Sequence, residues 1–307
     1  MTVVSVELIM QGTSYPLSYN ASTGKYAASI TAPTSSSFGL TGHYYPLKVR
    51  ATDDAGNVTE IDTTTAQIGD ALKLVVKERV APTTTIISPA ADAKVSTSAP
   101  VIEFNVMDAD SGVDATSVVL KIDQVTIPAS DLTSVSILGG IKFTYTPSDP
   151  LTDGAHQISV DASDNDGNVA VKASSAFTVD TTSPDLNVTA PIDGSAQASL
   201  QIAFAGQTND LMSSPVTIAV KLDGGVPVNP TVGADGRFSG VIDVPETAPD
   251  GVHTLTITAT DQIGNATTVT RQVTINRSAP VISNVVITPN PVETGQMFTI
   301  TVTVTDA

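Results

Sequence analysis

Apolar and polar residues alternate over short stretches of the chain, and turn-forming residues separate these stretches. The C-terminal stretch shows the pattern clearly, because Phe298, Ile300, Val302 and Val304 alternate with threonines. A period of two residues is the signature of a half-buried β-strand. The pattern recurs along most of the chain and predicts an all-β protein with almost no helix.

Three segments of this kind align with one another without a gap: YPLKVRATDDAGNV (45–58), HQISVDASDNDGNV (156–169) and HTLTITATDQIGNA (253–266). Each predicts a strand whose alternate apolar residues face a core, followed by an Asp-x-x-Gly-Asn turn. Glycine and asparagine tolerate a positive φ angle, and the aspartate can accept hydrogen bonds from the amides of the turn. The chain therefore contains three copies of one module.

A second hairpin repeats upstream of each of these strands: STGKYAASI (22–30), ADGRFSGVI (234–242) and, more loosely, LGGIKFTY (138–145). We align its three copies on Gly24, Gly140 and Gly236 as turn residues. Prolines recur at the start of successive modules, as Pro82, Pro184 and Pro280. A proline at such an entry keeps the edge strand short.

The residues ATDDAGN, ASDNDGN and ATDQIGN, together with DADSGVDATSVVLKID at 108–123, resemble bacterial and phage Ig-like repeat modules. The resemblance covers nearly the whole chain and implies tandem immunoglobulin-like β-sandwich modules in an elongated array. It implies little about function, because such modules serve as stalks, adhesin arms, virion decorations and spacers beside enzymes.

The repeats divide the chain into four parts. We predict complete modules at 81–183 and 184–278, an incomplete module at 1–80 that lacks its first two strands, and the first two strands of a further module at 279–307. The incomplete module begins directly on VVSVELIM, the counterpart of the third strand of a complete module.

The last segment supplies the two strands that the first module lacks. We therefore expect the tail of one copy to complete the head of another by strand addition, which generates a filament because head-to-tail contacts do not close. The residues expected at this contact are Phe298, Ile300, Val302 and Val304 in the tail, and Val4, Val6 and Leu8 in the head. The alternative is that the sequence is a fragment of a longer tandem array, and a fragment with these ends should associate for the same reason.

Composition narrows the classes of partner. Fourteen basic residues against 31 acidic ones give a formal net charge of −17, and in the absence of a basic cluster we expect no nucleic-acid partner. No stretch approaches the roughly 18 apolar residues of a membrane span, so we expect no membrane insertion. The chain has no cysteine, which removes disulfides and thiolate chemistry.

Candidate catalytic residues are few. His156 and His253 occupy the repeat position that Tyr45 fills in the first module, so they are positions of the fold, resembling the tyrosine corner of Ig sandwiches. His43 stands alone, and the sequence contains no Ser/His/Asp set, HExxH motif or phosphate-binding glycine loop. We therefore predict a protein that is not an enzyme.

Calcium is the one cofactor hypothesis that the carboxylates suggest. Five of them lie in two loops of the second module that an Ig sandwich places at one end: Asp108, Asp110, Asp114, Asp164 and Asp166. They could converge on one hard cation. The alternative is that these aspartates only cap turns and stay solvated. The third module keeps only Asp210 and Asp261 in these places, and we predict no site there.

Our functional prediction is a structural protein that joins copies of itself into an extracellular fibre or virion appendage. The alternative is an adhesin, or a capsid or tail decoration segment, whose sandwich loops bind a cell-surface glycan or protein. A third hypothesis is a spacer attached to an enzyme outside this chain. We expect the chain outside the cell, on the cell surface or on a virion.

Overall fold

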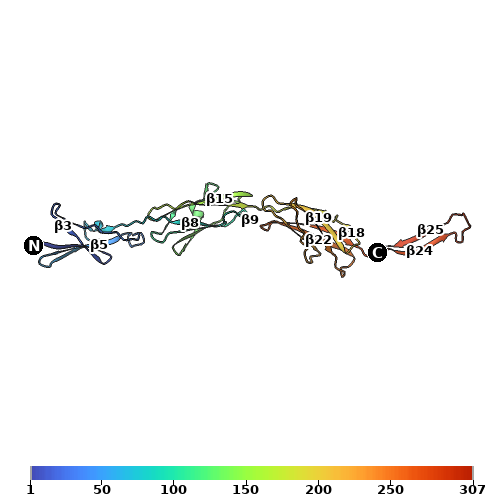
Figure 1. Ribbon diagram of the computed structural model, residues 1–307, viewed down its shortest axis with the longest axis horizontal. Helices are drawn as coiled ribbons and strands as arrows, with labels where there is room; N and C mark the ends of the chain where they lie inside the picture. The colour runs from blue at the N-terminus through green and yellow to red at the C-terminus, as the bar shows by residue number, and fades with distance from the viewer. Residues whose placement is uncertain (1, 306–307) are drawn as a thin grey trace. The chain divides into compact units, whose positions relative to one another are not determined.

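The computed structural model describes residues 2–305, whose regular secondary structure is almost entirely β-strand (Figure 1). This confirms the all-β fold class that the alternation predicts. The chain forms two compact units, Met1–Val179 and Asp180–Ala307. The first unit contains the first and second modules, and the second unit contains the third module and a C-terminal pair of strands.

The first module has one antiparallel sheet and a separate two-stranded sheet. The sheet runs in the order β2-β1-β5-β6 with β7 paired to β5, and β3 pairs only with β4 within the described chain. The bounds are β1 (Val3–Met10), β2 (Thr13–Pro16), β3 (Ser18–Asn20), β4 (Lys25–Ala27), β5 (Tyr45–Asp53), β6 (Val58–Ile61), η1 (Gly69–Leu72) and β7 (Lys73–Leu74).

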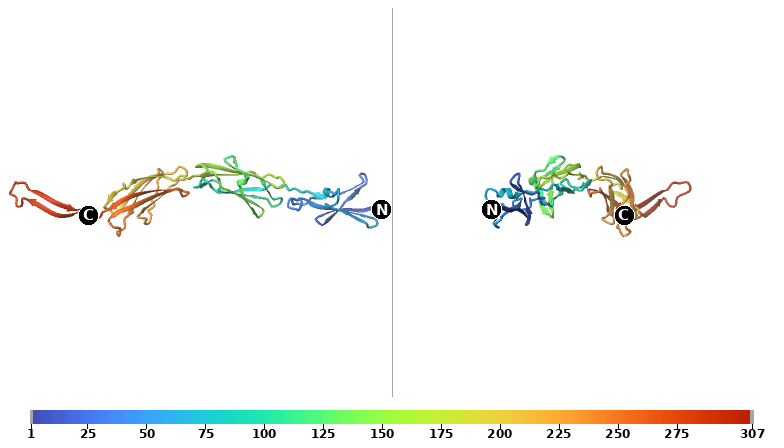
Figure 2. Two further views of the ribbon diagram at one scale, coloured as in Figure 1. Left: turned by 180° about the vertical axis from the view of Figure 1, so that it is seen from behind. Right: turned by 60° about the vertical axis from the view of Figure 1, so that its left-hand side comes forward.

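The second module is a sandwich of two sheets, with strand orders β13-β14-β10-β8 and β12-β11-β15-β16-β9. Its two layers are seen in green in Figure 2. The bounds are β8 (Thr83–Ser88), β9 (Ala93–Val95), β10 (Ile102–Met107), β11 (Val113–Ile122), β12 (Val125–Thr126), η2 (Ala129–Asp131), β13 (Thr133–Ile137), β14 (Gly140–Tyr145), β15 (Gly154–Asp164) and β16 (Ala173–Val179).

The third module repeats this sandwich with sheets β17-β19-β21 and β18-β23-β22-β20. The bounds are β17 (Asp185–Ala190), β18 (Ser195–Gln197), β19 (Gln201–Asn209), β20 (Thr217–Leu222), β21 (Arg237–Asp243), β22 (Gly251–Thr260) and β23 (Ala266–Ile275). The chain then continues into β24 (Val281–Thr288) and β25 (Thr299–Thr305), which pair with each other and are drawn in red in Figure 1. We call β24 and β25 the C-terminal hairpin.

Two continuous apolar cores form among residues 2–305, one in each complete module. Alternate residues of facing strands fill them, because successive side chains of a strand point to opposite faces. Phe104, Leu120 and Phe177 are among the most deeply buried side chains of the second module, and Phe204 and Leu255 have the same role in the third.

The repeated turns have the geometry that the sequence predicts. Asp164 accepts hydrogen bonds from the Asn168 backbone amide at 2.8 Å and from its side-chain amide at 2.7 Å. The pair Asp53 and Asn57 repeats both bonds at 2.8 and 2.9 Å, and Asp261 and Asn265 repeat them at 2.9 and 2.8 Å. This turn therefore forms in the first module as it does in the complete ones.

The structure corrects the alignment of the second repeated hairpin by one residue. Val106 lies opposite Ile141, and in the third module the Thr208 amide donates to the Gly236 carbonyl at 2.9 Å. Ile141, and not Gly140, is therefore the counterpart of Gly236. The reason is that the second module has no glycine at this place: its two glycines, Gly139 and Gly140, precede Ile141, and the sequence alignment placed the second of them there.

Candidate functional site

The first module has a partly exposed apolar sheet face. In each complete module, the equivalent face is covered by a second sheet. Strand β1 of the first module is the counterpart of β11 and β20, because all three pair with the repeated strand in one register: Leu8 with Val49, Leu120 with Val160, and Val220 with Ile257. Leu120 and Val220 are fully buried, whereas Leu8 is only partly buried. Val6, which pairs with Ala51, is also only partly buried, whereas its counterpart Ile218, which pairs with Ala259, is 2% exposed.

Strand β5 shows the same difference. Its residues Leu47, Val49 and Ala51 are partly exposed, although the equivalent residues of β22 in the third module, Leu255, Ile257 and Ala259, are completely buried. We call the face formed by Val4, Val6, Leu8, Leu47, Val49 and Ala51 the open face. It has the residues of a sandwich core, but within residues 2–305 no second sheet of full size covers it.

The C-terminal hairpin corresponds to the first two strands of a complete module. The pairing register shows this, because Thr305 lies opposite Val281 as Asn209 lies opposite Asp185 and Met107 opposite Thr83. Counting back from these pairs, Val304, Val302 and Ile300 occupy the places of Val106, Phe104 and Ile102. Within the described chain, the hairpin therefore matches the opening strand pair of a complete module.

The inward positions of the hairpin are exposed. Ile102, Phe104 and Val106 are fully buried, whereas Phe298, Ile300, Val302 and Val304 are 54%, 56%, 44% and 53% exposed. Five apolar residues of β24 are exposed as well: Val281, Ile282, Val285, Val286 and Ile287. Every residue predicted for self-association in the tail is thus accessible, and so is Val4 in the head, while Val6 and Leu8 are partly accessible.

The two equivalent histidines are bonded into the fold. His156 Nδ1 lies 2.6 Å from Asp123 Oδ2 and its Nε2 lies 2.7 Å from the Thr152 carbonyl oxygen. His253 makes the same contacts, at 2.6 Å to Asp223 Oδ2 and 2.8 Å to the Pro249 carbonyl oxygen. Both acceptors can be satisfied at once only when the imidazole is protonated on both nitrogens.

The pKa values of these groups follow from the same contacts. Burial lowers the pKa of His156, but its bonds to the Thr152 carbonyl and the Asp123 carboxylate outweigh burial and raise it. The Asp223 carboxylate is the main cause of the raised pKa of His253. Both ring nitrogens of each histidine are occupied, so neither ring is available as a catalytic base or a metal ligand. Tyr45 in the first module instead donates its hydroxyl to the Ser35 carbonyl at 3.2 Å.

An acidic cluster lies at one end of the second module. It joins Asp108 and Asp164, two of the five aspartates of the calcium hypothesis, to Glu78, and the three carboxylates have oxygen atoms within 4.8 Å of one another. Ser111 donates its backbone amide to Glu78 at 2.7 Å, while its buried hydroxyl lacks a partner in the described structure.

The other three aspartates of the hypothesis bond elsewhere. Asp110 accepts from the Ser36 amide at 3.0 Å, Asp114 accepts from the Thr116 amide at 2.9 Å, and Asp166 accepts from the Glu78 amide at 2.9 Å. The five-carboxylate arrangement is therefore corrected to a three-carboxylate cluster. Sequence reasoning missed Glu78 because it precedes the proline taken as the module boundary.

The third module has the same cluster in a more buried form. Asp180 joins Asp210 and Asp261, all three are buried, and their carboxylate oxygens also lie within 4.8 Å of one another. Asp180 is the counterpart of Glu78, and the Ser213 hydroxyl donates to it. Three carboxylates this close repel one another in a poorly hydrated place. Amide donors or a hard cation relieve that repulsion. A cation at the second-module cluster stays a prediction. The third-module cluster is a candidate that the sequence did not predict, because Asp180 lies outside the two loops compared.

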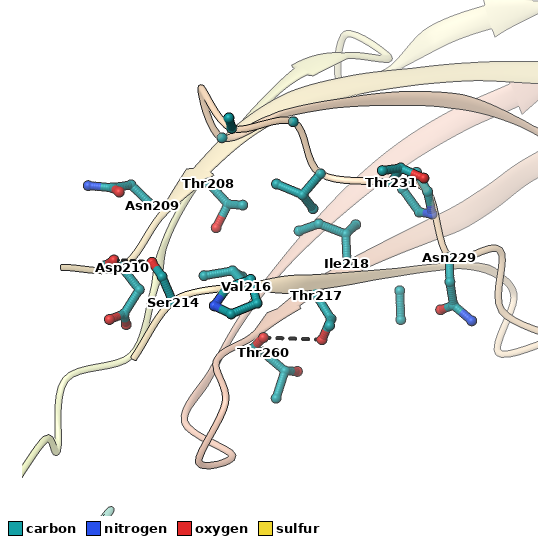
Figure 3. Close-up of a pocket in the computed structure, with 17 residues that line it drawn as sticks. Thr208, Asn209, Asp210, Ser214, Val216, Thr217, Ile218, Asn229, Thr231 and Thr260 are labelled. Atoms are coloured by element: carbon teal, nitrogen blue, oxygen red, sulfur yellow. Dashed lines mark hydrogen bonds between the residues drawn. The ribbon is translucent and has the colours of Figure 1, made fainter. Parts of the chain in front are cut away.

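A groove of about 930 Å³ opens beside β20 in the third module (Figure 3). Hydroxyl and amide side chains line much of it, among them Thr208, Asn209, Thr217, Asn229, Thr231 and Thr260. The Thr217 hydroxyl donates to the Thr260 carbonyl at 3.1 Å, which is one of the dashed lines of the figure. The lining includes one carboxylate, Asp210, and no aromatic ring. The groove can bind polar groups by hydrogen bonds.

Family profiles match most of the chain. Two profiles described as bacterial Ig-like domain match residues 87–181 and 3–70. The chain is a bacterial Ig-like repeat protein. A third profile, described as glucodextranase domain B, matches the remaining complete module of this Ig-like protein at residues 184–277. A comparison with curated proteins gave no significant match.

Solved structures with a similar fold include several repeat proteins. One is described as a Ca²⁺-stabilised adhesin with which an Antarctic bacterium binds ice (21% identity, 91% of this chain and 67% of that chain, TM-score 0.37). Another is a tetra-tandem repeat in the extending region of a large adhesion protein (18% identity, 99% and 80%, TM-score 0.32). A third comprises the fibronectin(III)-like modules of Clostridium thermocellum CbhA (16% identity, 62% and 93%, TM-score 0.38).

In the part of the Ig-like chain that the structure describes, no helix has the length and apolar character needed to cross a membrane.

Proposed function

We propose that this bacterial Ig-like repeat protein is a non-enzymatic structural or adhesive protein of the cell surface or a virion, and that its copies join head to tail by strand complementation. One observation carries the proposal: positions that are buried in the complete modules are exposed on the C-terminal hairpin, and on the open face they are partly exposed or, at Val4, exposed. Within the described residues, the open face lacks a covering strand pair, and the hairpin lacks a sheet to pack against.

The apolar surface on the hairpin gives the association its driving force. Full burial of a side chain of this kind stabilises by roughly 1.5 to 3 kcal/mol. Because Phe298, Ile300, Val302 and Val304 are about half exposed, their docking would contribute about 3 to 6 kcal/mol before ordering costs. Residues of the open face would add to this gain, so the total is comparable with the net stability of one domain.

The size of the hairpin suits a second copy of the chain as its partner. It runs from Val281 to Thr305, which is 305 − 281 + 1 = 25 residues, and a stable protein interface uses about 20 to 30 residues on each side. Neither of its strands contains a charged residue. Docking of the two strands therefore removes none of their own charges from water, and burying such strands avoids the main cost of a polar interface.

Size-exclusion chromatography with light scattering tests the proposal directly. The full chain should give oligomers whose mass rises with concentration, and the chain without residues 279–307 should stay monomeric. A chain without residues 1–80 is the matched control, because it keeps the hairpin, loses the open face and should also be monomeric. A full chain that stays monomeric at its highest soluble concentration would contradict strand complementation.

The adhesin alternative has a candidate surface in the groove beside β20. Its threonine and asparagine side chains could bond to the hydroxyls of a cell-surface glycan. Glycan-array signal from the full chain, lost when Thr217 and Thr231 are changed to valine, would support it. The threonine Thr268 on β23, outside the groove, provides the control substitution, Thr268→Val.

A further inference from the structure

The small sheet β3-β4 of the first module is the counterpart of β13-β14 in the second. Both pairs share one register: Tyr19 lies opposite Tyr26 as Ser134 lies opposite Phe143, and Ser18 lies opposite Ala27 as Thr133 lies opposite Thr144. A basic residue followed by an aromatic residue marks the inner strand in each module, as Lys25-Tyr26, Lys142-Phe143 and Arg237-Phe238.

In the second module this pair is half of a four-stranded sheet, with β10 and β8 continuing it in the order β13-β14-β10-β8. In the first module the sheet stops at β4, since β4 pairs with no strand but β3 in the described chain. The hairpin β24-β25, the counterpart of β8-β10, is likewise unpaired on its β25 side. The first module and the hairpin thus hold complementary halves of one sheet.

We propose that β25 of one copy pairs antiparallel with β4 of the next copy, with Val302 opposite Tyr26, so that a sheet of order β3-β4-β25-β24 forms across two chains. This inference rests on the proposed head-to-tail association and names the edge strand and the register that the association uses.

Two modules give this register independently. Phe104 lies opposite Phe143 in the second module, and Gly206 lies opposite Phe238 in the third. Val302 is the counterpart of Phe104 and Gly206, and Tyr26 is the counterpart of the two phenylalanines. Both modules therefore place Val302 against Tyr26. The same register places Thr301 opposite Ala27, as Glu103 lies opposite Thr144 and Ala205 opposite Ser239.

The Tyr26 side chain is held in a position that fits this role. Its ring lies 5.1 Å from the ring of Tyr19, and its hydroxyl donates to the Val3 carbonyl on β1 at 3.4 Å. The ring is only partly buried, whereas Phe143 and Phe238 are each 3% exposed in their complete sheets. In the complete modules the neighbouring strand, β10 or β19, lies beside the phenylalanine. In the first module β25 of another copy would take the equivalent place beside Tyr26.

The hydrogen-bond pattern identifies positions for a covalent test. The Asp108 amide donates to the Gly139 carbonyl, and the Thr208 amide donates to the Gly236 carbonyl, both at 2.9 Å. Hydrogen-bonded pairs alternate with non-hydrogen-bonded ones in an antiparallel ladder, so the pair formed by Thr301 and Ala27 is of the second type. The Cα atoms of such a pair lie about 4.5 Å apart, within the reach of a disulfide.

The experiment uses two full-length variants, Ala27→Cys and Thr301→Cys. The natural chain has no cysteine, so every disulfide must come from the introduced residues. After mixing and mild oxidation, a covalent dimer should appear on non-reducing electrophoresis, while neither variant alone should give one, because the contact joins different surfaces. A double variant whose cross-link stays within one chain would contradict a contact between copies.

The matched control is Ser29→Cys mixed with Thr301→Cys. This pair is displaced by two residues, so its Cα atoms would lie about 7 to 8 Å apart, and it should cross-link at least roughly tenfold less. Oligomers in light scattering with a dominant 29–301 cross-link, or with neither cross-link, would overturn the register and leave the association standing. A monomeric chain would overturn both.

Discussion

The strands β10 and β25 have the same alternating pattern and equivalent partner strands, β8 and β24, yet opposite surroundings. Ile102 on β10 is fully buried and Ile300 at the equivalent place on β25 is 56% exposed. The period of two specifies the strand in both cases, but burial depends on a facing sheet that only the complete module has. Local sequence thus determines the strand, and tertiary structure determines whether its apolar side is covered.

The first module likewise has the local structure of a complete module without its burial. Its Asp53 turn and the register of β1 on β5 match those of the complete modules, although its apolar face is open. The same turns and strand pairing therefore form in a module that lacks a full second layer. What the open module lacks is the burial energy of its apolar face.

The largest expected effect comes from joining the two halves within one chain. A permuted chain in which residues 279–307 precede residue 1 should be monomeric, and its first module should gain about 3 to 6 kcal/mol of unfolding free energy from the newly buried side chains. Hydrogen exchange of the β1 and β5 amides measures this gain. Unchanged protection would show that the hairpin does not cover the open face.

A charge introduced on β25 should weaken association when it is on the inward face and have little effect when it is on the outward face. Val302→Asp places a carboxylate on the inward side and should weaken association by at least about 2 kcal/mol, or roughly 30-fold, because an unpaired charge would be buried. Thr301→Asp introduces the same carboxylate on the outward side of the strand. Analytical ultracentrifugation of the two variants should show near-natural association for the second, and equal losses would contradict the assignment of the faces.

Calcium should stabilise the complete modules and leave the first one unchanged, if the acidic clusters bind it. At a concentration of about 100 times the dissociation constant, binding adds about 2.7 kcal/mol of stability. Asp261→Asn removes one carboxylate of the third-module cluster and should abolish the effect there. Asp53→Asn alters the equivalent turn of the first module and is its control. Calorimetric titration of the natural chain without heat would remove the hypothesis.

The smallest effect concerns pH. The pKa of His253 is raised above its ordinary value of 6.5, so its contribution to stability is complete below about pH 6.5 and declines as pH rises through the raised pKa. Burial raises the pKa of Asp223, but its bonds to His253 and Thr254 outweigh burial and lower it below 3.8. Its contribution is therefore present above about pH 3.8 and declines as pH falls through the lowered pKa.

The third module should accordingly have its highest melting temperature between about pH 4 and 6.5. Asp223→Asn should flatten the decline above that window by weakening the main cause of the histidine's raised pKa. The first module, which has Tyr45 in place of the histidine, should lack this decline. Melting curves from pH 4 to 9 measure both, and an unchanged slope in the variant would contradict the assignment.

The sequence predicted the strands, the turns and the repeat well, since these depend on nearby residues. The open face and the hairpin were also readable, because complete copies of the same module stand in the same chain and show which strands are absent. The partner of each histidine was not predicted. Asp123 and Asp223 directly follow β11 and β20, in turns where their φ angles are 49° and 48°. They lie outside the repeated segments that contain the histidines. The similar motifs KID and KLD, which end on these aspartates, could have revealed them.

The acidic clusters were only partly predictable. Loops at one end of a sandwich could be paired from topology, which brought Asp108 and Asp164 together. Glu78 and Asp180 come from the segments between modules, whose path depends on packing. The directions of Asp110 and Asp114 were also beyond the sequence, because nearby amides of Ser36 and Thr116 hold them away from the cluster.

The uncharged hairpin strands have a consequence for the handling of the free protein. Val281–Thr288 and Thr299–Thr305 combine exposed apolar residues with high β-propensity and no gatekeeping charge, the composition from which cross-β stacks grow. The net charge of −17 is carried elsewhere on the chain. Long-range repulsion between the acidic modules therefore has to keep free tails apart, and salt that screens it should favour amyloid-like precipitation of unassembled copies.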